Sequence, residues 1–379
     1  MSRRAQFIPY RPKTILNKGK RADHWFWTRY SAYPYLGCQH DCQFCYCRER
    51  KYSPYDDPHD FAYVIKVKEN APDLLRRALR RAPVDAVFTG DYQPAERKFN
   101  LSRQMLEVCL ELGFPVFVLE RSVLILRDLE LLEALHQRAR VMAAFSIIST
   151  PDSPNYARVR QMERLAPPPE KRFAAMEKIA AAGIPVGTVF MPIMPGLCDD
   201  DANLQQVVRW TVEHGGQFTL PAGLTLADQQ KDYFLGVLEQ RMPDLLPLYR
   251  KYYPSGSYGP SGWDWKKTAL RVREWCQHYG IRDRAPRPII PTDKRALNKR
   301  IVEILADKIY TLELNDAFPA RLWAYRKAAW AIDDLEQDIG LVYRTLGQKG
   351  LQSIPNVGSS LALEVEKILK NLCPDEQEI

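Results

Sequence analysis

Short β-rich runs of apolar residues alternate with stretches of helical periodicity through the first 224 residues of the chain. The runs cover residues 33–37, 86–91, 115–121, 141–147, 185–193 and 218–224. Amphipathic helical patterns fill the gaps, at residues 101–112, 171–182 and 203–214 among others. About six β/α repeats at this spacing predict a parallel sheet with helices outside it, curled into a partial barrel. Functional side chains are then expected at the carboxyl ends of the strands.

The chain of 379 residues has room for one large domain and a smaller one. A proline-rich linker at residues 285–291 precedes further helical patterns, at residues 296–312, 319–335 and 339–347. They end in residues 351–369, which look like a helix-hairpin-helix. We therefore predict a four-part organisation. Its parts are a basic, aromatic N-terminal arm (1–30), a partial barrel (31–230), a basic, aromatic extension with a linker (231–293), and an all-α helix-hairpin-helix domain (294–372).

Composition indicates a cytoplasmic protein. No apolar run is long enough to span a bilayer, and the first residues lack the apolar stretch of a signal peptide. Four of the eight cysteines crowd into residues 38–47 and the others are scattered, which is no disulfide framework and suits a reducing compartment.

The net charge of +8 is unevenly placed. Residues 1–50 carry ten Lys or Arg against three acids, and residues 241–295 carry twelve against five, both with interleaved aromatic residues. Cations that attract phosphates, together with rings that stack on bases, are typical of nucleic-acid surfaces. Each cluster alone could be a solvated face with its aromatic residues turned inward, but two together favour a polyanionic partner.

The most specific motif is a CxxxCxxC triplet formed by Cys38, Cys42 and Cys45. Three thiolates in one short loop can each hold one iron of a 4Fe-4S cubane, which leaves the fourth iron open for a small molecule. Cys47 is not expected to be a ligand, because it would compete for that open iron. The alternatives are a zinc knuckle or buried thiols, but zinc ribbons use paired CxxC units and the sequence has no second pair.

This triplet, followed by the aromatic Tyr46, resembles the signature of radical S-adenosylmethionine (SAM) enzymes. Residues 12–225 are similar to the spore photoproduct lyase branch of that superfamily, and four segments carry the likeness: 88–96, 145–147, 163–172 and 182–187. The resemblance implies a 4Fe-4S cluster and SAM as cofactors, and an electron donor such as flavodoxin or ferredoxin. It also implies a 5'-deoxyadenosyl radical that abstracts hydrogen from a DNA base lesion.

By position, the resemblance assigns the SAM pocket to Tyr46, Gly90, Asp91, Arg121, Ser146 and Met191. The chemistry agrees for two of them. Asp91 could accept hydrogen bonds from the SAM ammonium group, and Arg121 could pair with its carboxylate. The alternatives are that Asp91 caps the following helix and that Arg121 pairs with a nearby acid such as Glu120.

Two positions depart from the lyase. The cysteine that returns a hydrogen atom in that family is replaced by Phe88, and a tyrosine just before the third cluster cysteine is replaced by Phe44. Tyr46 remains and is a candidate catalytic residue. Cys198, in the loop after the fifth predicted strand, is a candidate substitute donor. The alternative for Cys198 is an incidental small residue in a turn.

Residues 294–370 resemble the small N-terminal domain of family X DNA polymerases, including residues 324–329. A hairpin turn at Asn356 and Gly358, followed by a helix that starts near Ser359, points backbone N-H groups outward and can hold a phosphate. Asn356 replaces the first hairpin glycine and tolerates left-handed backbone angles. Glu364 replaces the Schiff-base lysine of that family, so we expect a DNA clamp without its own chemistry. The alternative is a helical packing or protein-docking module.

The extension is expected to contact DNA through Arg250, Lys251, Tyr258, Trp263, Lys266 and Lys267, with the aromatic rings as wedges that unstack a duplex. The alternative is that these rings close the open side of the barrel. The sequence therefore predicts a radical SAM enzyme that repairs or modifies damaged double-stranded DNA and does not act at a membrane. RNA modification and a non-catalytic iron-sulfur DNA-binding protein are the alternative functions.

Overall fold

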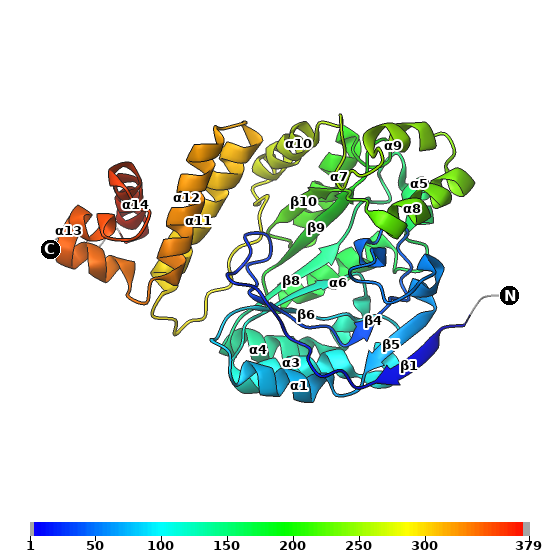
Figure 1. Ribbon diagram of the computed structural model, residues 1–379, viewed down its shortest axis with the longest axis horizontal. Helices are drawn as coiled ribbons and strands as arrows, with labels where there is room; N and C mark the ends of the chain where they lie inside the picture. The colour runs from blue at the N-terminus through cyan, green and yellow to red at the C-terminus, as the bar shows by residue number, and fades with distance from the viewer. Residues whose placement is uncertain (1–3, 374–379) are drawn as a thin grey trace. The chain divides into compact units, whose positions relative to one another are not determined.

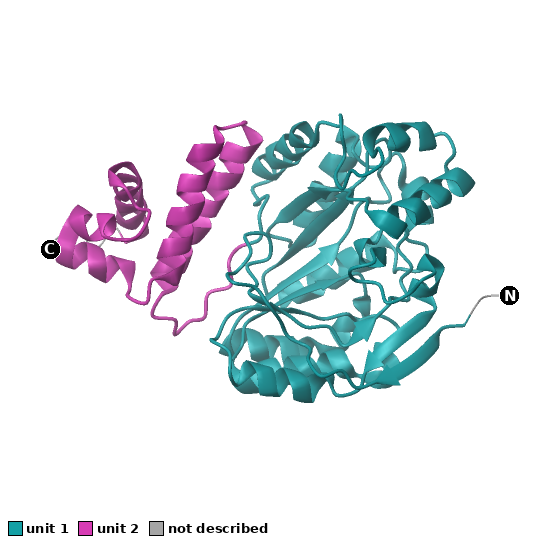
Figure 2. Cartoon of the chain, viewed as in Figure 1, with its two compact units in different colours: residues 1–285 teal, residues 286–379 magenta. Residues whose placement is uncertain are grey.

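The computed structural model describes residues 4–373. The chain divides into two compact units, residues 1–285 and residues 286–379 (Figure 2). The first unit contains the predicted arm, barrel and most of the extension, and the first three residues of that arm lie outside the described residues. Among residues 4–373, no helix is both long enough and apolar enough to cross a membrane.

A seven-stranded sheet forms the centre of the first unit, in the order β10-β9-β8-β7-β6-β3-β2. All neighbouring strands from β3 to β10 pair in parallel, and β2 (Asn17–Lys18) is antiparallel at the edge. The parallel strands are β3 (Tyr30–Ser31), β6 (Val87–Thr89), β7 (Val116–Glu120), β8 (Val141–Ser146), β9 (Val186–Ile193) and β10 (Thr219–Gly223). Over the described residues the sheet stays open, so the predicted parallel α/β fold is confirmed without a closed barrel.

The first strand of the sheet lies earlier than the sequence predicted. Residues 30 and 31 pair with β6, whereas the expected strand was 33–37. The ladder ends where the Ala32 N-H donates to the Phe88 oxygen, because Pro34 has no N-H to continue it. Residues 35 and 36 form β4 (Tyr35–Leu36) of a separate three-stranded sheet, with order β1-β5-β4. The other members of that sheet are β1 (Gln6–Tyr10) and β5 (Val64–Lys68).

Helices cover the outer face of the large sheet. Figure 1 shows α1, α3 and α4 lying together along one side of it. The outer helices are α1 (Ala71–Leu79), α3 (Leu101–Leu112), α4 (Leu129–Arg138), α6 (Pro169–Ala181) and α7 (Asp201–Glu213). Strand side chains alternate between the two faces: Val116 and Val118 of β7 pack in the outer core, and Phe117 packs in a separate cluster with Met142 and Ala144.

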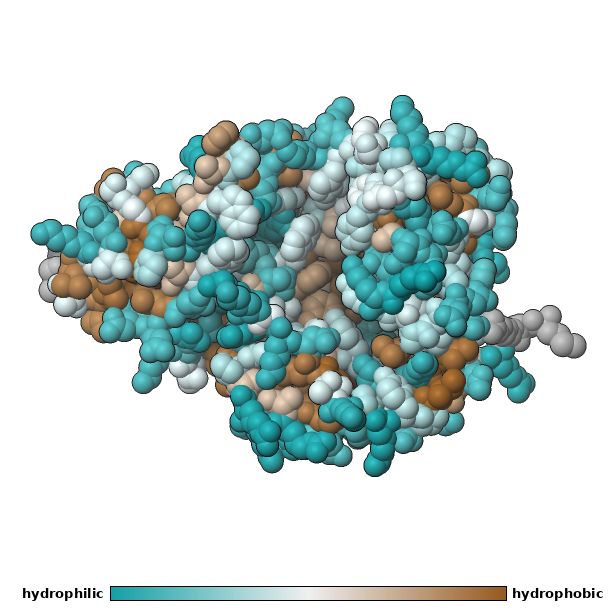
Figure 3. All heavy atoms as spheres, viewed as in Figure 1, coloured by the Kyte–Doolittle hydropathy of each residue, from teal (hydrophilic) through white to brown (hydrophobic). Residues whose placement is uncertain are grey.

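The face of the sheet away from these helices is concave. Figure 3 shows this face hollowed over β8 and β9, with apolar side chains at the bottom. The remaining helices of the first unit are α2 (Glu96–Phe99), α5 (Tyr156–Met162), α8 (Asp228–Arg241), α9 (Leu246–Tyr252) and α10 (Trp265–His278).

The second unit is helical. Its helices are α11 (Ala296–Leu314), α12 (Pro319–Asp334), α13 (Ile339–Gln352) and α14 (Ser359–Leu372). In α13 the backbone of Gly347 is non-helical with φ of 58°, which is where the sequence predicted that helix to end. Helix α11 packs on α12, and α13 packs on α14. The helix-hairpin-helix assignment of this unit stays a prediction.

Candidate iron-sulfur and cofactor site

The loop that carries the three motif cysteines is held by amide side chains at both of its ends. Gln93 donates through Nε2 to the Gly37 oxygen at 3.0 Å, and its Oε1 accepts from the Gln39 N-H at 3.1 Å. At the other end Gln230 Nε2 of α8 donates to the Phe44 oxygen at 3.3 Å. These bonds satisfy main-chain groups of the loop and leave the thiols free for ligands.

A buried arginine holds the middle of the same loop. Arg48 is fully buried, forms an ion pair with Asp41, and its guanidinium carbon lies 4.2 Å from the centroid of the Tyr233 ring in α8. Tyr233 in turn donates to Gln43 Oε1 at 2.8 Å. The loop is therefore fixed against a helix that lies some 190 residues further along the chain.

The thiols differ in their electrostatic surroundings. Burial raises the pKa of Cys42 to about 11, although the nearby Arg121 charge opposes it. A hydrogen bond from Cys47 lowers the pKa of Cys45 to about 7, and the same bond raises the pKa of Cys47. Cys45 thus has the stronger thiolate character of the two, in keeping with the predicted ligand set, which stays a prediction.

The cysteines fit a cluster better than a single ion. Within residues 4–373 no three His, Cys, Asp or Glu side chains converge closely enough to hold one metal ion. A cubane binds each thiolate to a different iron. All three motif cysteines are free thiols on one short loop. The donor set therefore fits a 4Fe-4S cluster with one iron left for another ligand.

Gly90 and Asp91 form a turn in left-handed conformation at the end of β6, with φ of 133° and 75°. The buried Glu120 carboxylate holds this turn, because its Oε1 accepts from the N-H groups of Asp91 at 2.7 Å and Tyr92 at 3.1 Å. A Cβ at position 90 would lie 2.6 Å from the same oxygen, so glycine is required there. Glu120 is therefore a backbone anchor and not the partner of Arg121.

The Asp91 carboxylate faces the cysteine loop. It accepts from Gln93 Nε2 at 3.1 Å, the same amide that holds the loop. Helix α2 begins after Ala95 and receives no side-chain cap, so the alternative role of Asp91 as a helix cap is not found. Burial raises the pKa of Asp91 to about 8. A cationic ligand such as an ammonium group would favour its charged form.

Three of the predicted SAM residues meet at one main-chain oxygen. Ser146 Oγ at the end of β8 donates to the Met191 oxygen at 3.1 Å, and Arg121 Nη2 just after β7 donates to it at 3.4 Å. The Arg121 guanidinium carbon also lies 5.1 Å from the centroid of the Phe44 ring in the cysteine loop. The structure thus brings these strand ends next to the loop.

Sequence reasoning missed the acid that positions Arg121. Glu163 is fully buried and forms ion pairs with Arg121, Arg160 and Arg172. Arg172 also donates to the Ser146 oxygen at 2.9 Å, which ties this charge cluster to the end of β8. The sequence did contain a sign of their importance, because Glu163 and Arg172 are the first and last residues of one of the segments similar to the lyase.

The predicted catalytic residues lie in different surroundings. Tyr46 is 51% exposed, and its ring is edge-on to Tyr52. Cys198 is fully buried, and its sulfur accepts the Met194 N-H at 3.0 Å within its own loop. This placement favours the turn alternative, and a catalytic role for Cys198 stays a prediction. Phe88 stacks on Phe117, with ring centroids 5.6 Å apart, on the concave face.

The predicted DNA contacts of the extension divide into exposed and packed side chains. Tyr258 is 51% exposed, and Lys51 Nζ lies 5.4 Å from the centroid of its ring. Trp263 is partly buried and donates to Asp199 at 3.1 Å. The cations Arg250, Lys251 and Lys267 are exposed and Lys266 is partly exposed, all on α9 and α10.

In the second unit the predicted turn has the expected backbone. Asn356 has φ of 63°, the left-handed conformation that the sequence predicted it to tolerate. Gly358 is the N-cap of α14, which begins at Ser359, and both residues are exposed. Glu364 accepts from Tyr325 at 2.5 Å and pairs with Lys308, so it has a structural role in the packing of three helices.

Comparison with known proteins indicates the class of enzyme to which such a site belongs. Residues 33–206 match the family model described as the Radical SAM superfamily. Members of this superfamily use a 4Fe-4S cluster and SAM, and the cysteine loop with its adjoining strand ends fits that pair of cofactors. The match and the fold support a radical SAM enzyme.

Particular relatives share parts of the chain. An uncharacterized protein of Mycobacterium tuberculosis is 28% identical over 253 residues, which is 65% of this chain and 72% of that protein. An uncharacterized protein of Methanocaldococcus jannaschii is 26% identical over 204 residues, 52% of this chain and 72% of that protein.

Solved structures of spore photoproduct lyase share the fold. A cysteine-to-alanine mutant of that lyase superposes with a TM-score of 0.54 at 18% identity, covering 73% of this chain and 80% of that chain. The same kind of mutant with a dinucleoside spore photoproduct gives a TM-score of 0.53 at 17% identity, with the same coverage.

Proposed function

We propose that this protein is a radical SAM enzyme that repairs or modifies damaged nucleobases in DNA, by chemistry related to but distinct from that of spore photoproduct lyase. The observation that carries the proposal is the meeting of Arg121, Ser146 and Met191 beside the cysteine loop. When bound, the cluster and SAM supply a 5'-deoxyadenosyl radical that abstracts hydrogen. The protein's part is to orient SAM and to hold the target atom against it.

The residues of this chain suit the two charged groups of the SAM methionine moiety. Asp91 lies in a turn that Gln93 joins to the cysteine loop and would accept hydrogen bonds from the ammonium group. Arg121, already oriented by Glu163, would donate to the carboxylate. Tyr46 and Ser146 complete the proposed pocket. Both charged groups of SAM would then lie next to the loop that is proposed to hold the cluster.

DNA as the substrate is supported by surface chemistry. The exposed Tyr258 ring lies in the extension near Lys51, and Arg250, Lys251 and Lys267 are exposed on the flanking helices. The exposed N-terminus of α14 offers main-chain donors for a phosphate. Positive charge with a stackable ring suits a nucleic acid whose target base must leave the duplex.

The replacement of a cysteine by Phe88 is the reason to propose a reaction distinct from the lyase. A phenyl ring packed on Phe117 has no thiol hydrogen to return to a product radical. The hydrogen must then come from another group, or the product must leave in a different oxidation state.

The test is anaerobic reconstitution, reduction with dithionite in the presence of SAM, and chromatography for 5'-deoxyadenosine. We expect its formation to rise with ultraviolet-damaged duplex DNA over undamaged DNA. Stimulation by RNA alone would instead support an RNA-modifying enzyme. If no 5'-deoxyadenosine forms under any condition, the non-catalytic alternative replaces the proposal.

A further inference from the structure

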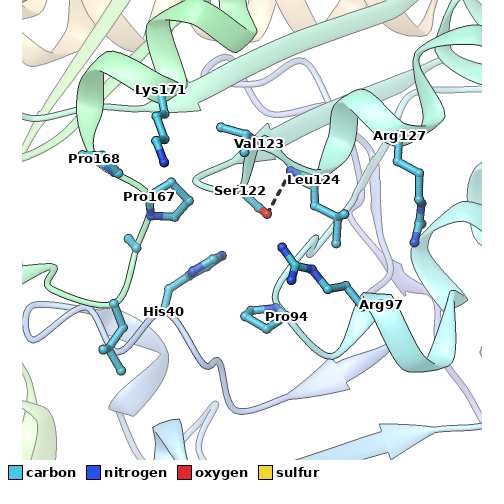
Figure 4. Close-up of a pocket in the computed structure, with 12 residues that line it drawn as sticks. His40, Pro94, Arg97, Ser122, Val123, Leu124, Arg127, Pro167, Pro168 and Lys171 are labelled. Carbon is cyan, nitrogen blue, oxygen red and sulfur yellow. Dashed lines mark hydrogen bonds between the residues drawn. The ribbon is translucent and has the colours of Figure 1, made fainter.

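A pocket of about 490 Å³ opens beside the cysteine loop and is separate from the proposed SAM site. His40, which lies between Cys38 and Cys42, forms one wall, and segments after β6 and β7 and before α6 form the others (Figure 4). None of the six predicted SAM residues lines it. The pocket is thus a second opening that adjoins the cluster loop.

Strand geometry explains why the pocket is distinct from the SAM site. Arg121 faces the Met191 oxygen, and Ser122 follows it in extended conformation with φ of −90° and ψ of 132°. Successive side chains of an extended segment point to opposite sides. Ser122 therefore faces the pocket, and the pocket lies behind the group that orients SAM.

His40 forms a buried wall of this pocket. The residue is only 6% exposed, and both of its ring nitrogens are shielded from solvent. Figure 4 shows the His40 ring and the Arg97 guanidinium facing each other across the pocket. A ligand with an acceptor atom placed there would pair with Arg97.

The rim of the pocket is cationic. Arg97 and Lys171 are exposed, and no ion pair or hydrogen bond of their side chains occurs within residues 4–373. Arg127, the third cation, already pairs with Glu96 and Asp128. The described lining includes no acidic residue, so two free positive charges face whatever enters.

The rest of the lining is apolar and partly exposed. It includes Pro94, Leu124 and Leu165, and Leu165 is 54% exposed. An exposed apolar surface with charged residues at its rim is typical of protein docking sites. The backbone of a nucleic acid would gain little from this apolar part, because its contacts are mainly to phosphates.

The position of His40 in the chain indicates what a molecule bound in this pocket would lie next to. His40 is two residues from Cys38 and two from Cys42, so its Cα lies within about 7 Å of the Cα of either proposed ligand, given a maximum reach of about 3.6 Å per residue. A molecule docked against His40 is therefore adjacent to the proposed cluster. It approaches from the side that does not hold SAM.

We propose that this pocket docks an acidic one-electron carrier protein, whose carboxylate enters between Arg97 and Lys171. This inference rests on the proposed cluster. One electron passes from the reduced carrier to the oxidised cluster, which is reduced by one electron, and no proton or bond is transferred. Redox partners commonly form small, weak and charge-steered complexes, which suits a surface of this size.

The test uses a flavodoxin of net negative charge as the probe. Its affinity is measured by microscale thermophoresis with cluster-loaded and with cluster-free protein, at low and high salt. Stopped-flow absorbance then gives the rate of cluster reduction by the reduced flavodoxin and, separately, by dithionite. The variant is Arg97→Glu combined with Lys171→Glu. Its matched control is Lys178→Glu, an exposed position further along α6 that does not line the pocket.

We expect the double variant to weaken flavodoxin binding at least about tenfold and to slow flavodoxin-driven reduction similarly, since each charge reversal turns an attraction into a repulsion. Reduction by dithionite should be unchanged, and the control variant should behave as wild type. Equal flavodoxin binding by wild type and the double variant would overturn the inference. So would a loss of duplex DNA affinity without a change in flavodoxin binding, which would assign the pocket to a nucleic-acid backbone.

The experiment separates this inference from the proposed function. If dithionite supports SAM cleavage but the double variant binds flavodoxin normally, the docking site alone is wrong. If dithionite supports no SAM cleavage in wild type, the proposed function fails, whatever the binding data show.

Discussion

Arg121, directly after β7, and Ser146, at the end of the neighbouring β8, donate to the same acceptor, the main-chain oxygen of Met191. The guanidinium of Arg121 is also paired with the buried Glu163, so its orientation is fixed before any ligand arrives. Such preorganisation lowers the conformational entropy that the Arg121 side chain loses when a ligand binds.

Replacing Arg121 should therefore impair SAM binding specifically. We expect Arg121→Met to lower SAM affinity about tenfold to a hundredfold, because charge-assisted hydrogen bonds contribute about 1.5–3 kcal/mol. Arg160→Met is the matched control, since Arg160 also pairs with Glu163 but is not a predicted SAM residue. Both variants should lower Tm, and only the first should change SAM affinity by equilibrium dialysis. Equal affinity losses in the two variants would contradict the assignment.

The ligand set of the cluster can be tested by single substitutions. Cys38→Ala, Cys42→Ala and Cys45→Ala should each lose most of the bound iron and sulfide after anaerobic reconstitution, because each removes one of three ligands. Cys47→Ala should retain them, since Cys47 donates a hydrogen bond to Cys45 and is not needed as a ligand. Analysis of bound iron and acid-labile sulfide distinguishes the variants that keep the cluster from those that lose it. Loss of the cluster in Cys47→Ala with retention in Cys45→Ala would reverse the assignment.

Much of the fold could be predicted from local patterns. The strand at residues 141–147 and the helix at residues 101–112 have strong periodicity and are found as β8 and α3. The first strand was misplaced because Tyr33 to Gly37 also reads as a strand. Residues 35 and 36 join another sheet for two reasons. Pro34 has no N-H to continue the first ladder, and β5, which lies far along the chain, pairs with these two residues.

The wedge role of the extension gives a prediction about Tyr258. Tyr258→Ala should weaken binding to bubble or lesion DNA by about 1–3 kcal/mol, the usual contribution of one stacked base, without a change in Tm. Tyr253→Ala is the control, because Tyr253 is 2% exposed and donates to the Leu224 oxygen. That control should lose about 3–5 kcal/mol of unfolding free energy. Fluorescence anisotropy and calorimetry separate the two effects.

Trp263 was predicted as a second wedge, and its packing modifies that test. Its indole donates to Asp199 and its ring lies 5.7 Å from that of Trp265. Trp263→Ala should therefore lower Tm whether or not the ring also contacts DNA. A fall in DNA affinity is informative for Trp263 only at temperatures well below that Tm.

The second unit gives a prediction about phosphate binding. Gly358→Val should weaken duplex binding severalfold, because the new side chain blocks access to the N-H groups at the N-terminus of α14. The cluster content should stay unchanged. No atom lies within 4 Å of a Cβ at this position, so the substitution meets no steric clash. Gln352→Val, at an exposed position in the same unit, should bind as wild type.

The salt dependence of wild type gives an independent check on this electrostatic binding. The log-log slope of affinity against salt should be about 0.9 for each phosphate contacted. Binding that does not respond to salt would refute the electrostatic basis of the proposal.

The residues that support the site were harder to predict than those that face the ligand. Glu163, Arg172 and Gln93 lie in segments similar to the lyase, but a single sequence does not show which groups they pair with. A pair between Glu120 and its neighbour Arg121 was the alternative to SAM binding by Arg121. Glu120 anchors the Asp91 turn instead, because side chains adjacent in a strand point to opposite faces.

The left-handed backbone of Asp91 has a consequence for engineering. A residue with a Cβ in that conformation stores about 1–2 kcal/mol of conformational energy, which glycine would release. Asp91→Gly should therefore raise Tm while it abolishes the contact to the SAM ammonium group. Activity and thermostability oppose each other at this position, so a search for stabilising substitutions would select against the aspartate that the site requires.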